Sequence, residues 1–440
     1  MIVNFSIKNF GCIKDRQTLS FEAEKSKHLE DFYVHKIKNT RLLKIALIYG
    51  ANASGKSTVL KALDFLRNLV LEPASIKTEE LEFEPFLFDP STPKQNSELA
   101  IEFFQNETKY YYEVEFNRHA VMKEYLSKSP YNTIIFKRET DLKNRVAKIK
   151  FGTKTKISKY DKQTLALNTL WNNTVLGGYL KTNIEIKELQ EVVNWFEYFL
   201  LSVISSETNL TGLVNMLFDK NKINKNTVLN ILKKADFNVS DIEFKKARKT
   251  PFLQELYTLL TLEIKKNSGL SKKKREQIIE KIDQNIIKPF LFHFVNGKNY
   301  QLPLEHESKG TQRYYGLAGL LALLIHDRKA VPIDELEASL HPDLFQHFLL
   351  TFLANARQSQ IIATTHNREI LNDKDVIRDD ALWITDKTEN AATELYSFAD
   401  FDSSVIRNTT NRLNVYKSGK LGGIPNLSDY YLNVDDGQEK

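Results

Sequence analysis

Residues 42–58 read LLKIALIYGANASGKST and combine two local signals. Leu42 to Tyr49 is an apolar run interrupted only by Lys44, which is typical of a β-strand buried on both faces. The residues that follow are small, and a helix-forming run begins near Lys56. A strand, a glycine-containing loop and a helix in this order are the context that a phosphate-binding loop requires. The segment therefore predicts a nucleotide site at the end of a buried strand.

The loop carries the groups that such a site needs. Small residues let successive backbone N–H groups converge on phosphates at a helix N-terminus. Lys56 is expected to place a positive charge at the β- and γ-phosphates, and the Ser57 hydroxyl is expected to join the Mg²⁺ shell. The predicted nucleotide-binding residues are Gly50, Asn52, Ala53, Ser54, Gly55, Lys56, Ser57 and Thr58.

A second segment supplies acids at the end of an apolar strand, Val331-Pro332-Ile333-Asp334-Glu335. Asp334 is expected to bind Mg²⁺, directly or through water. Glu335 is expected to orient the water that attacks the γ-phosphate. Two adjacent acids are common by chance. The interpretation of this segment as part of a nucleotide site therefore depends on the phosphate loop found earlier in the chain. The predicted metal ligands are Ser57 and Asp334, the predicted base is Glu335, and the predicted cofactor is Mg²⁺ with ATP.

Length and composition narrow the class of protein. With 440 residues the chain exceeds the size of most single cores, so a second lobe is expected. The 62 basic and 56 acidic residues give a net charge of +6, which permits nucleic-acid binding without indicating it. Cys12 is the single cysteine, which excludes an internal disulfide. No signal peptide is visible, and residues 314–325, the longest nearly apolar stretch, fall short of the ~20 residues that span a membrane. A cytoplasmic protein without a membrane partner is expected.

The pattern along the chain predicts four parts. Residues 1–122 read as antiparallel strands around the phosphate loop, and 123–300 as a mainly helical insertion. Residues 301–425 alternate helices and strands, which implies parallel pairing, and 426–440 read as a flexible tail. Two basic clusters lie in the insertion, at 245–249 and 272–275. A solvated face is the simpler interpretation, and contact with DNA or RNA is the alternative.

Two further motifs resemble those of the ATP-binding-cassette (ABC) ATPases. Ser308-Lys309-Gly310-Thr311-Gln312 resembles the signature loop, and Thr364-Thr365-His366 resembles the segment with the switch histidine. The resemblance implies an α/β P-loop NTPase of the ABC head type, with a mixed sheet, antiparallel N-terminal strands and an inserted helical lobe. It also implies that ATP is held between two copies. Ser308 and Gly310 of one copy then reach the γ-phosphate of the other, and His366 helps to place the water.

Three segments together resemble the short AAA15 family of bacterial ATPases, and the resemblance covers nearly the whole chain. They are residues 5–11, the block 333–342 and the segment Tyr416-Lys417-Ser418-Gly419-Lys420-Leu421-Gly422-Gly423-Ile424-Pro425. That family includes the ATPase subunits of AbiL, RloA and PARIS AriA anti-phage systems. The resemblance implies a homo-oligomer that controls a separate toxin or Toprim-type nuclease, with a phage component as trigger.

Some features depart from the ABC pattern. Lys309 takes a position that is often glycine, His341 stands where transporters of the ABC type usually have Asp, and Gln95 is an unassigned candidate for the glutamine loop.

Two rival functions stay open. One is a repair ATPase resembling the RecF group, which would use the basic clusters on DNA. The other is a scaffold that binds ATP and rarely cleaves it.

Overall fold

The computed structural model describes residues 1–144, 146–246, 287–401, 412–420 and 422–424, which form two compact units. The first unit contains Met1–Val203, Ala330–Glu335 and the described residues from Gln360 onward. The second contains the described residues of Ile204–Lys329 and of Leu336–Ser359. The basic residues 247–249 and 272–275 and the tail 426–440 lie outside the described residues.

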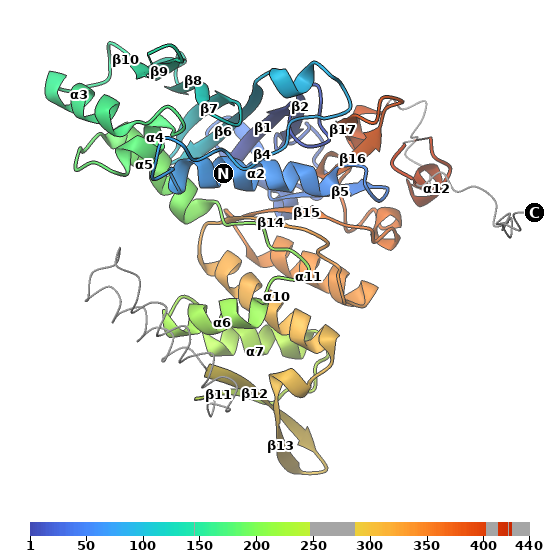
Figure 1. Cartoon of the computed structure of the whole chain (residues 1–440). Coiled ribbons are helices and arrows are strands. Elements are labelled where there is room, and N and C mark those ends of the chain that lie inside the picture. Colours follow the sequence, from blue (N-terminus) through green and yellow to red (C-terminus); the bar gives the residue numbers. More distant parts are fainter. Residues whose placement is uncertain (145, 247–286, 402–411, 421, 425–440) are drawn as a thin grey trace, which may run out of the picture. The chain divides into compact units, whose positions relative to one another are not determined.

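A seven-stranded antiparallel sheet forms one part of the first unit, in the order β10-β9-β8-β7-β6-β1-β2 (Figure 1). Alternate residues of these strands are buried, as in β7, because one face of the sheet packs on the core. The antiparallel strands expected at the N-terminus include β1 and β2, which pair with each other, and β2 lies at the sheet edge. The strands are β1 Ile2–Lys8, β2 Gln17–Ser20, β6 Ser97–Gln105, β7 Thr108–Phe116, β8 Val121–Lys128, β9 Thr133–Asp141 and β10 Val146–Phe151.

A five-stranded sheet in the order β14-β15-β5-β16-β17 forms the other part of this unit. Only β17 is antiparallel, so the first four strands end at the same edge. Every residue of β5 is buried, as its apolar sequence predicts. The strands are β5 Ile45–Gly50, β14 Ala330–Ile333, β15 Gln360–Thr364, β16 Leu382–Lys387 and β17 Thr393–Ser397.

Helix α2 (Lys56–Leu71) packs against strands of both sheets. Its buried residues include Val59, Leu63, Leu66 and Val70, which share one face at helical spacing. Shorter elements complete the unit: α1 Glu30–Tyr33, β3 Val34–Ile37, β4 Thr40–Leu43, η1 Thr92–Lys94, α3 Lys159–Asn168, α4 Val175–Tyr179, α5 Lys187–Asn194, η2 Trp195–Phe199, η4 Glu369–Asn372, η5 Asp379–Ala381, η6 Phe398–Asp400 and α12 Arg412–Lys417.

The secondary structure corrects the expected start of the helical insertion at residue 123. Residues 121–128, 133–141 and 146–151 form β8, β9 and β10, which continue the antiparallel sheet, and the helices of this region begin only at Lys159. The alternation that marks such strands is visible in Lys148-Ile149-Lys150-Phe151, but the lysine-rich composition of the region obscured it. The expected helical character is found in helices between residues 159 and 234, whereas residues 241–246, 287–295 and 298–303 form strands.

The second unit is built around the long helix α10 (Lys309–His326). Gly316 and Gly319 of α10 allow a close approach, because a Cβ atom at either position would lie 2.2 or 2.3 Å from Leu210 or Val214 of α6. A three-stranded sheet lies in the same unit. The other elements are α6 Leu210–Asp219, α7 Lys225–Lys234, β11 Asp241–Lys246, β12 Ile287–Val295, β13 Lys298–Pro303, η3 Leu304–His306 and α11 Pro342–Asn355. Among the described helices, none has the length and apolarity to cross a bilayer.

Lys44, which precedes β5, has a buried side chain in the first unit, and burial lowers its pKa from 10.5 to about 8. The folded protein therefore loses this proton before the unfolded chain does, and stability should rise as the pH increases from about 8 to 10.5. Replacing Lys44 with Met should raise the free energy of unfolding at pH 7 by about 1–3 kcal/mol and flatten that rise. Chemical denaturation at pH 7, 9 and 10.5 measures both effects. The exposed Lys25→Met control should change neither, and an unchanged pH profile in Lys44→Met would contradict the assignment.

Candidate functional site

The loop between β5 and α2 has a backbone that neighbouring strands shape closely. Ala53 and Gly55 adopt left-handed backbone angles, with φ of 61° and 107°. A Cβ atom at Gly55 would lie 2.4 Å from the Oγ1 atom of Thr393 in β17, and one at Gly50 would lie 2.4 Å from Thr385 Oγ1 in β16. Glycine is required at both positions because β16 and β17 pack directly on the loop.

Lys56 is the first residue of α2, and its side chain is 6% exposed. Its Nζ atom donates hydrogen bonds to the carbonyl oxygens of Gly50 at 3.0 Å and of Ala51 at 2.9 Å. The ammonium group is thus held against its own loop. The sequence predicts a charge at this position, and the structure fixes that charge beside the backbone that would surround a phosphate.

Ser57 and Asp334 meet although 277 residues separate them. The Ser57 Oγ atom donates to Asp334 Oδ1 at 2.9 Å, and Thr364 Oγ1 donates to the same oxygen at 2.6 Å. Asp334 follows β14, and Thr364 is the last residue of β15. The contact exists because β14, β15 and β5 run parallel and end at one edge. One carboxylate and one hydroxyl are a donor set that suits Mg²⁺, which keeps waters and binds phosphate oxygens besides.

Glu335 follows Asp334 and is exposed. Its φ of 50° is left-handed, a conformation that costs energy for residues other than glycine. Its backbone N–H donates to Thr364 Oγ1 at 2.8 Å. Thr364 therefore accepts from Glu335 and donates to Asp334, which fixes the two acids relative to each other. The strained backbone and this shared threonine give the two adjacent carboxyl groups different surroundings, one half-buried and one open.

His366 lies two residues beyond β15 and is exposed. The N–H of Thr365, immediately before it, donates to the carbonyl oxygen of Ile48 in β5 at 3.1 Å. The histidine is therefore anchored at the strand edge that carries Lys56, Ser57, Asp334 and Glu335. Ligand sites in open α/β sheets lie at the carboxyl ends of the strands.

The candidate signature residues begin α10 in the second unit. Ser308 caps the helix, since its Oγ atom accepts from the Thr311 N–H at 3.0 Å and lies 2.8 Å from Thr311 Oγ1. Gln312 Nε2 donates to the Glu307 carbonyl at 2.8 Å. Ser308 and Lys309 are exposed, and a Cβ atom at Gly310 would lie 3.2 Å from the Ser339 carbonyl. The loop thus presents a helix N-terminus with an exposed serine and lysine.

Other predicted positions have local roles in the structure. Gln95 is exposed and its Nε2 atom donates to Ser91 Oγ in its own turn at 3.2 Å. His341 caps α11 by accepting from the Asp343 N–H at 3.3 Å. Cys12 is half-buried, with Sγ 3.0 Å from Thr58 Oγ1. The side chain of Gln95 is thus held within its own turn.

Sequence reasoning missed several residues around the phosphate loop. Ser54 Oγ lies 2.6 Å from Thr385 Oγ1, and Thr393 Oγ1 donates to the Ser54 carbonyl at 2.8 Å. Thr364 stands beside the predicted His366, but no role was predicted for it. The threonines that end the apolar run 361–365 were the available signal for Thr364. No local sequence pattern indicates a role for Thr385 or Thr393, because their contacts with the phosphate loop form only when β16 and β17 join the sheet.

The glycine-rich segment after α12 also lies against the phosphate loop. Gly422 and Gly423 have left-handed φ angles of 65° and 68°. A Cβ atom at Gly423 would lie 3.4 Å from the Gly50 Cα atom and 2.8 Å from Ile384. Tyr416 Oη donates to the Gly423 carbonyl at 2.8 Å, and the Tyr416 ring packs on the ring of Tyr49 with centroids 6.1 Å apart. The sequence contained this motif but did not indicate its place.

A side chain at Gly423 should therefore disturb the phosphate loop without touching a nucleotide directly. We expect Gly423→Val to weaken ATP binding about tenfold, because the added atoms press on Ile384 and Gly50. Isothermal titration with ATP and Mg²⁺ measures the change. Gly297→Val is the matched control: Gly297 has a left-handed φ of 78°, but a Cβ atom there would meet no other atom within 4 Å among the described residues. Equal ATP affinity in Gly423→Val and the wild type would contradict a role for this segment.

These features define the class of the protein. A buried parallel strand, a phosphate loop and a helix, with an acidic pair at the end of a second parallel strand, form the core of a P-loop ATPase. The mixed sheet and the separate antiparallel sheet that contains the N-terminal strands make this the α/β fold of the ABC head type, as the sequence predicted.

Residues 45–166 and 186–372 match the family described as "AAA domain, putative AbiEii toxin, Type IV TA system". The match covers more than half of the chain, so the chain belongs to this family. No curated protein matches it in sequence.

Solved structures that match the chain include heads of SMC proteins. One is an SMC head bound to the C-winged helix domain of ScpA, with 11% identity and a TM-score of 0.48, covering 90% of this chain and 97% of that chain. Another is the SMC head domain from Thermotoga maritima, with 13% identity and a TM-score of 0.41, covering 90% and 98%. A third is the Smc head of Pyrococcus furiosus with an extended coiled coil, bound to the C-terminal domain of ScpA, with 11% identity and a TM-score of 0.39, covering 90% and 96%.

Proposed function

We propose that the chain binds and hydrolyses ATP as one subunit of a bacterial anti-phage system, and that its nucleotide state controls a separate toxin or Toprim-type nuclease. The observation that carries the ATPase part is the hydrogen bond between Ser57 and Asp334. It joins the phosphate loop to the acidic pair at one strand edge, as a shared metal ion requires. The defence part is supported by membership of a family whose description names a toxin–antitoxin system.

ATP would be bound chiefly by the loop from Gly50 to Thr58. The backbone N–H groups at the start of α2 face phosphate oxygens in such a loop, and Lys56 exchanges its carbonyl partners for the β- and γ-phosphates. Mg²⁺ would be held by Ser57 and Asp334, and when bound it neutralises charge on the transferring phosphoryl group. Thr364 keeps the Asp334 carboxylate oriented for this role.

Hydrolysis would use Glu335 as the general base. Its carboxylate takes a proton from water while the water oxygen forms a bond to the γ-phosphorus and the bond to the β–γ bridging oxygen breaks. The products are ADP and inorganic phosphate. His366, anchored at the same edge through Thr365, would contact the γ-phosphate and help to place the water. Slow turnover suits a switch, because the ATP-bound state must persist long enough to hold a partner.

The signature residues would act from a second copy of the chain. Ser308 and Lys309 are exposed at the N-terminus of α10, where backbone N–H groups favour an anion. Ser308 and Gly310 would donate to the γ-phosphate held by the other copy, and Thr311 and Gln312 would keep the loop in shape. The result is a cytoplasmic homo-oligomer in which ATP forms part of the interface.

Mass photometry tests this assembly. The Glu335→Gln variant should bind ATP without cleaving it and should double in mass with Mg²⁺ and ATP, but not with EDTA. Ser308→Arg added to this variant should keep ATP binding and prevent the doubling, because the larger side chain blocks the exposed helix N-terminus. A Glu335→Gln protein of constant mass under all conditions would refute the ATP-bound dimer.

Phage plating tests the defence role. Cells that carry the gene with its neighbouring reading frames should give fewer plaques than cells that carry the Lys56→Ala gene. The tagged wild-type protein should retain the neighbour's product in a pull-down, and the amount retained should differ between ATP and ADP. Equal plating with both genes would contradict the proposed control of a toxin. So would retention of the same amount of the neighbour's product with ATP and with ADP.

A further inference from the structure

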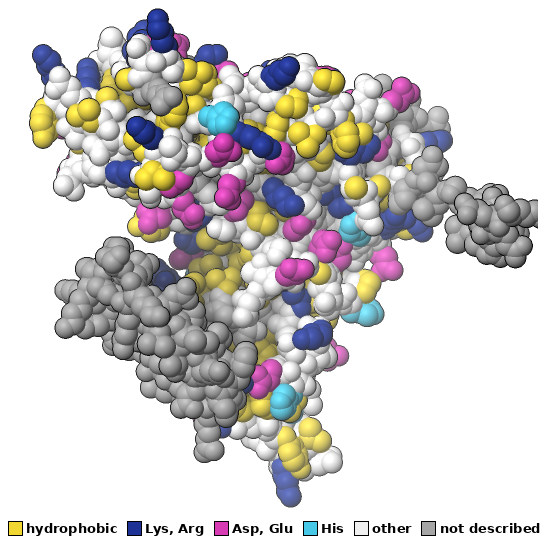
Figure 2. Space-filling view, in the orientation of Figure 1, with side chains coloured by type: hydrophobic (Ala, Val, Ile, Leu, Met, Phe, Trp, Pro, Cys, Tyr) yellow, Lys and Arg dark blue, Asp and Glu magenta, His cyan; other side chains and the backbone are white. Residues whose placement is uncertain are grey.

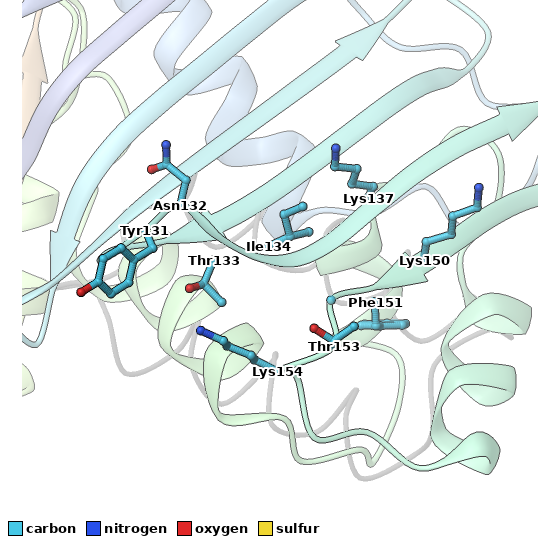
Figure 3. A pocket seen from close by; sticks show the side chains of 10 residues that line it. Tyr131, Asn132, Thr133, Ile134, Lys137, Lys150, Phe151, Thr153 and Lys154 are labelled. Carbon is cyan, nitrogen blue, oxygen red and sulfur yellow. The ribbon is translucent and has the colours of Figure 1, made fainter.

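A cavity of about 440 Å³ lies at the end of the β9–β10 hairpin, in the first unit (Figure 3). Its volume is in the range of ligand sites, roughly 300–1,000 Å³. It is lined by Lys137 and Lys150 from the two strands, by Tyr131 from the turn before β9, and by Thr153 and Lys154 after β10. None of these residues belongs to the phosphate loop or to the acidic pair.

The cavity concentrates positive charge. Lys137 and Lys150 are direct cross-strand partners in the β9–β10 register, an arrangement that costs energy because like charges face each other. In Figure 3 both side chains extend to the same side of the strands. No acidic residue lines the cavity in the described part of the chain. By contrast, Lys148 on the same strand forms an ion pair with Asp141 at 2.7 Å.

The wider surface has the same character. In Figure 2, Lys and Arg side chains gather over the region where Figure 1 places β9, β10 and α3. The acidic Glu139 lies two residues beyond Lys137, opposite Lys123 and Lys148 rather than at the cavity. Lys137, Lys150 and Lys154 are exposed, and the Lys137 Nζ atom also lies 5.2 Å from the centroid of the Tyr125 ring. A bound anion would offset the charge of all three lysines.

Tyr131 gives this cavity an aromatic surface. It is 91% exposed, the largest exposed fraction among the described large hydrophobic residues. Tyr131 and Asn132 have left-handed φ angles of 69° and 47°, which form the tight turn between β8 and β9. Because the ring is so exposed, packing in the core does not stabilise it. Its faces can instead stack on a planar group.

We propose that this cavity binds a single strand of nucleic acid. Successive phosphates along the strand contact Lys137, Lys150 and Lys154, and the Tyr131 ring stacks on an unpaired base, while Thr133 and Thr153 can donate to phosphate or sugar oxygens. A duplex offers the phosphates but keeps its bases paired. An acidic peptide offers the charge but no base for the ring, so the combination of amines and ring favours the single strand.

Fluorescence anisotropy with a labelled 20-nucleotide single strand and the full chain, without ATP, tests the site. Replacing Lys137, Lys150 and Lys154 with Ala should weaken binding at least tenfold and reduce the slope of log affinity against log salt by about 2, since each lost phosphate contact contributes about 0.7. Tyr131→Ala should weaken binding about tenfold through lost stacking. Far-UV circular dichroism establishes that each variant is folded.

Two matched variants serve as controls. Lys148→Ala removes a paired lysine of the same strand, and Tyr160→Ala removes a ring of α3 that is 75% exposed. Neither should change affinity more than twofold. Wild-type affinity and salt slope in the triple lysine variant would overturn the proposal. So would equal affinity for a duplex with no effect of Tyr131→Ala, or complete displacement by an equal concentration of a poly-glutamate peptide. Because no step uses ATP, failure here leaves the proposed ATPase intact.

Discussion

Exchanging Glu335 for glutamine is expected to lower the single-turnover rate of ATP hydrolysis by about 10²- to 10⁴-fold, the usual contribution of a general base. Glutamine keeps the size of the side chain and leaves the backbone N–H that donates to Thr364 in place. It cannot accept the proton from the attacking water. The amount of ATP bound should therefore stay at the wild-type level while the conversion of bound ATP to ADP slows.

Rapid quench with radiolabelled ATP and excess enzyme separates these two effects, because only bound ATP is followed. Glu369→Gln is a suitable control, since Glu369 is an exposed glutamate that follows β15, the strand beside β14, and has no part in the site. Hydrolysis at the wild-type rate in Glu335→Gln would show that another group, or no protein group, takes the proton.

The second large effect is expected from Lys56→Ala. The lysine amine is buried against the carbonyls of Gly50 and Ala51, and its removal takes away the charge that the loop holds ready for phosphate. Losing one partner of a buried charged contact typically costs about 2–5 kcal/mol. ATP affinity should fall by about 30- to 4,000-fold.

Equilibrium binding of a fluorescent ATP analogue measures this loss. Lys61→Ala is the control, because Lys61 lies on the exposed face of the same helix α2. Without nucleotide, Lys61→Ala should unfold at the wild-type temperature, and only Lys56→Ala should lose the further stabilisation that ATP gives. Full stabilisation of Lys56→Ala by ATP would mean that the loop does not bind the phosphates as proposed.

The local parts of the site could be predicted because their signals are local. The apolar run of β5, the small residues after it and the start of α2 near Lys56 are each visible within a few residues. The same holds for β14 before Asp334 and for β15 before His366. Parallel strands with a common edge then imply that Ser57 and Asp334 lie close together, and the structure shows them in direct hydrogen-bond contact.

Other features depend on long-range contacts that no local pattern encodes. Thr385 and Thr393 reach the phosphate loop only because β16 and β17 extend the sheet beyond β5. Gly423 belongs to a motif that the sequence shows, but its place beside Gly50 follows from the path of the last segment. The sequence predicts a helical region in place of β8 to β10 because the lysine-rich composition of that region masks the alternation of these strands.

The hydrogen bond between Thr393 of β17 and the phosphate loop determines when the contacts of that loop can be completed during translation. Thr393 binds the carbonyl of Ser54, which is 339 residues earlier in the chain. At roughly 5–20 residues per second, translation needs on the order of 20–70 seconds to connect them. During that interval the nascent chain has a phosphate loop without its β17 neighbour. The full set of contacts around the phosphate loop can therefore form only late in translation, and chains that stop before β17 should bind ATP more weakly than the full chain.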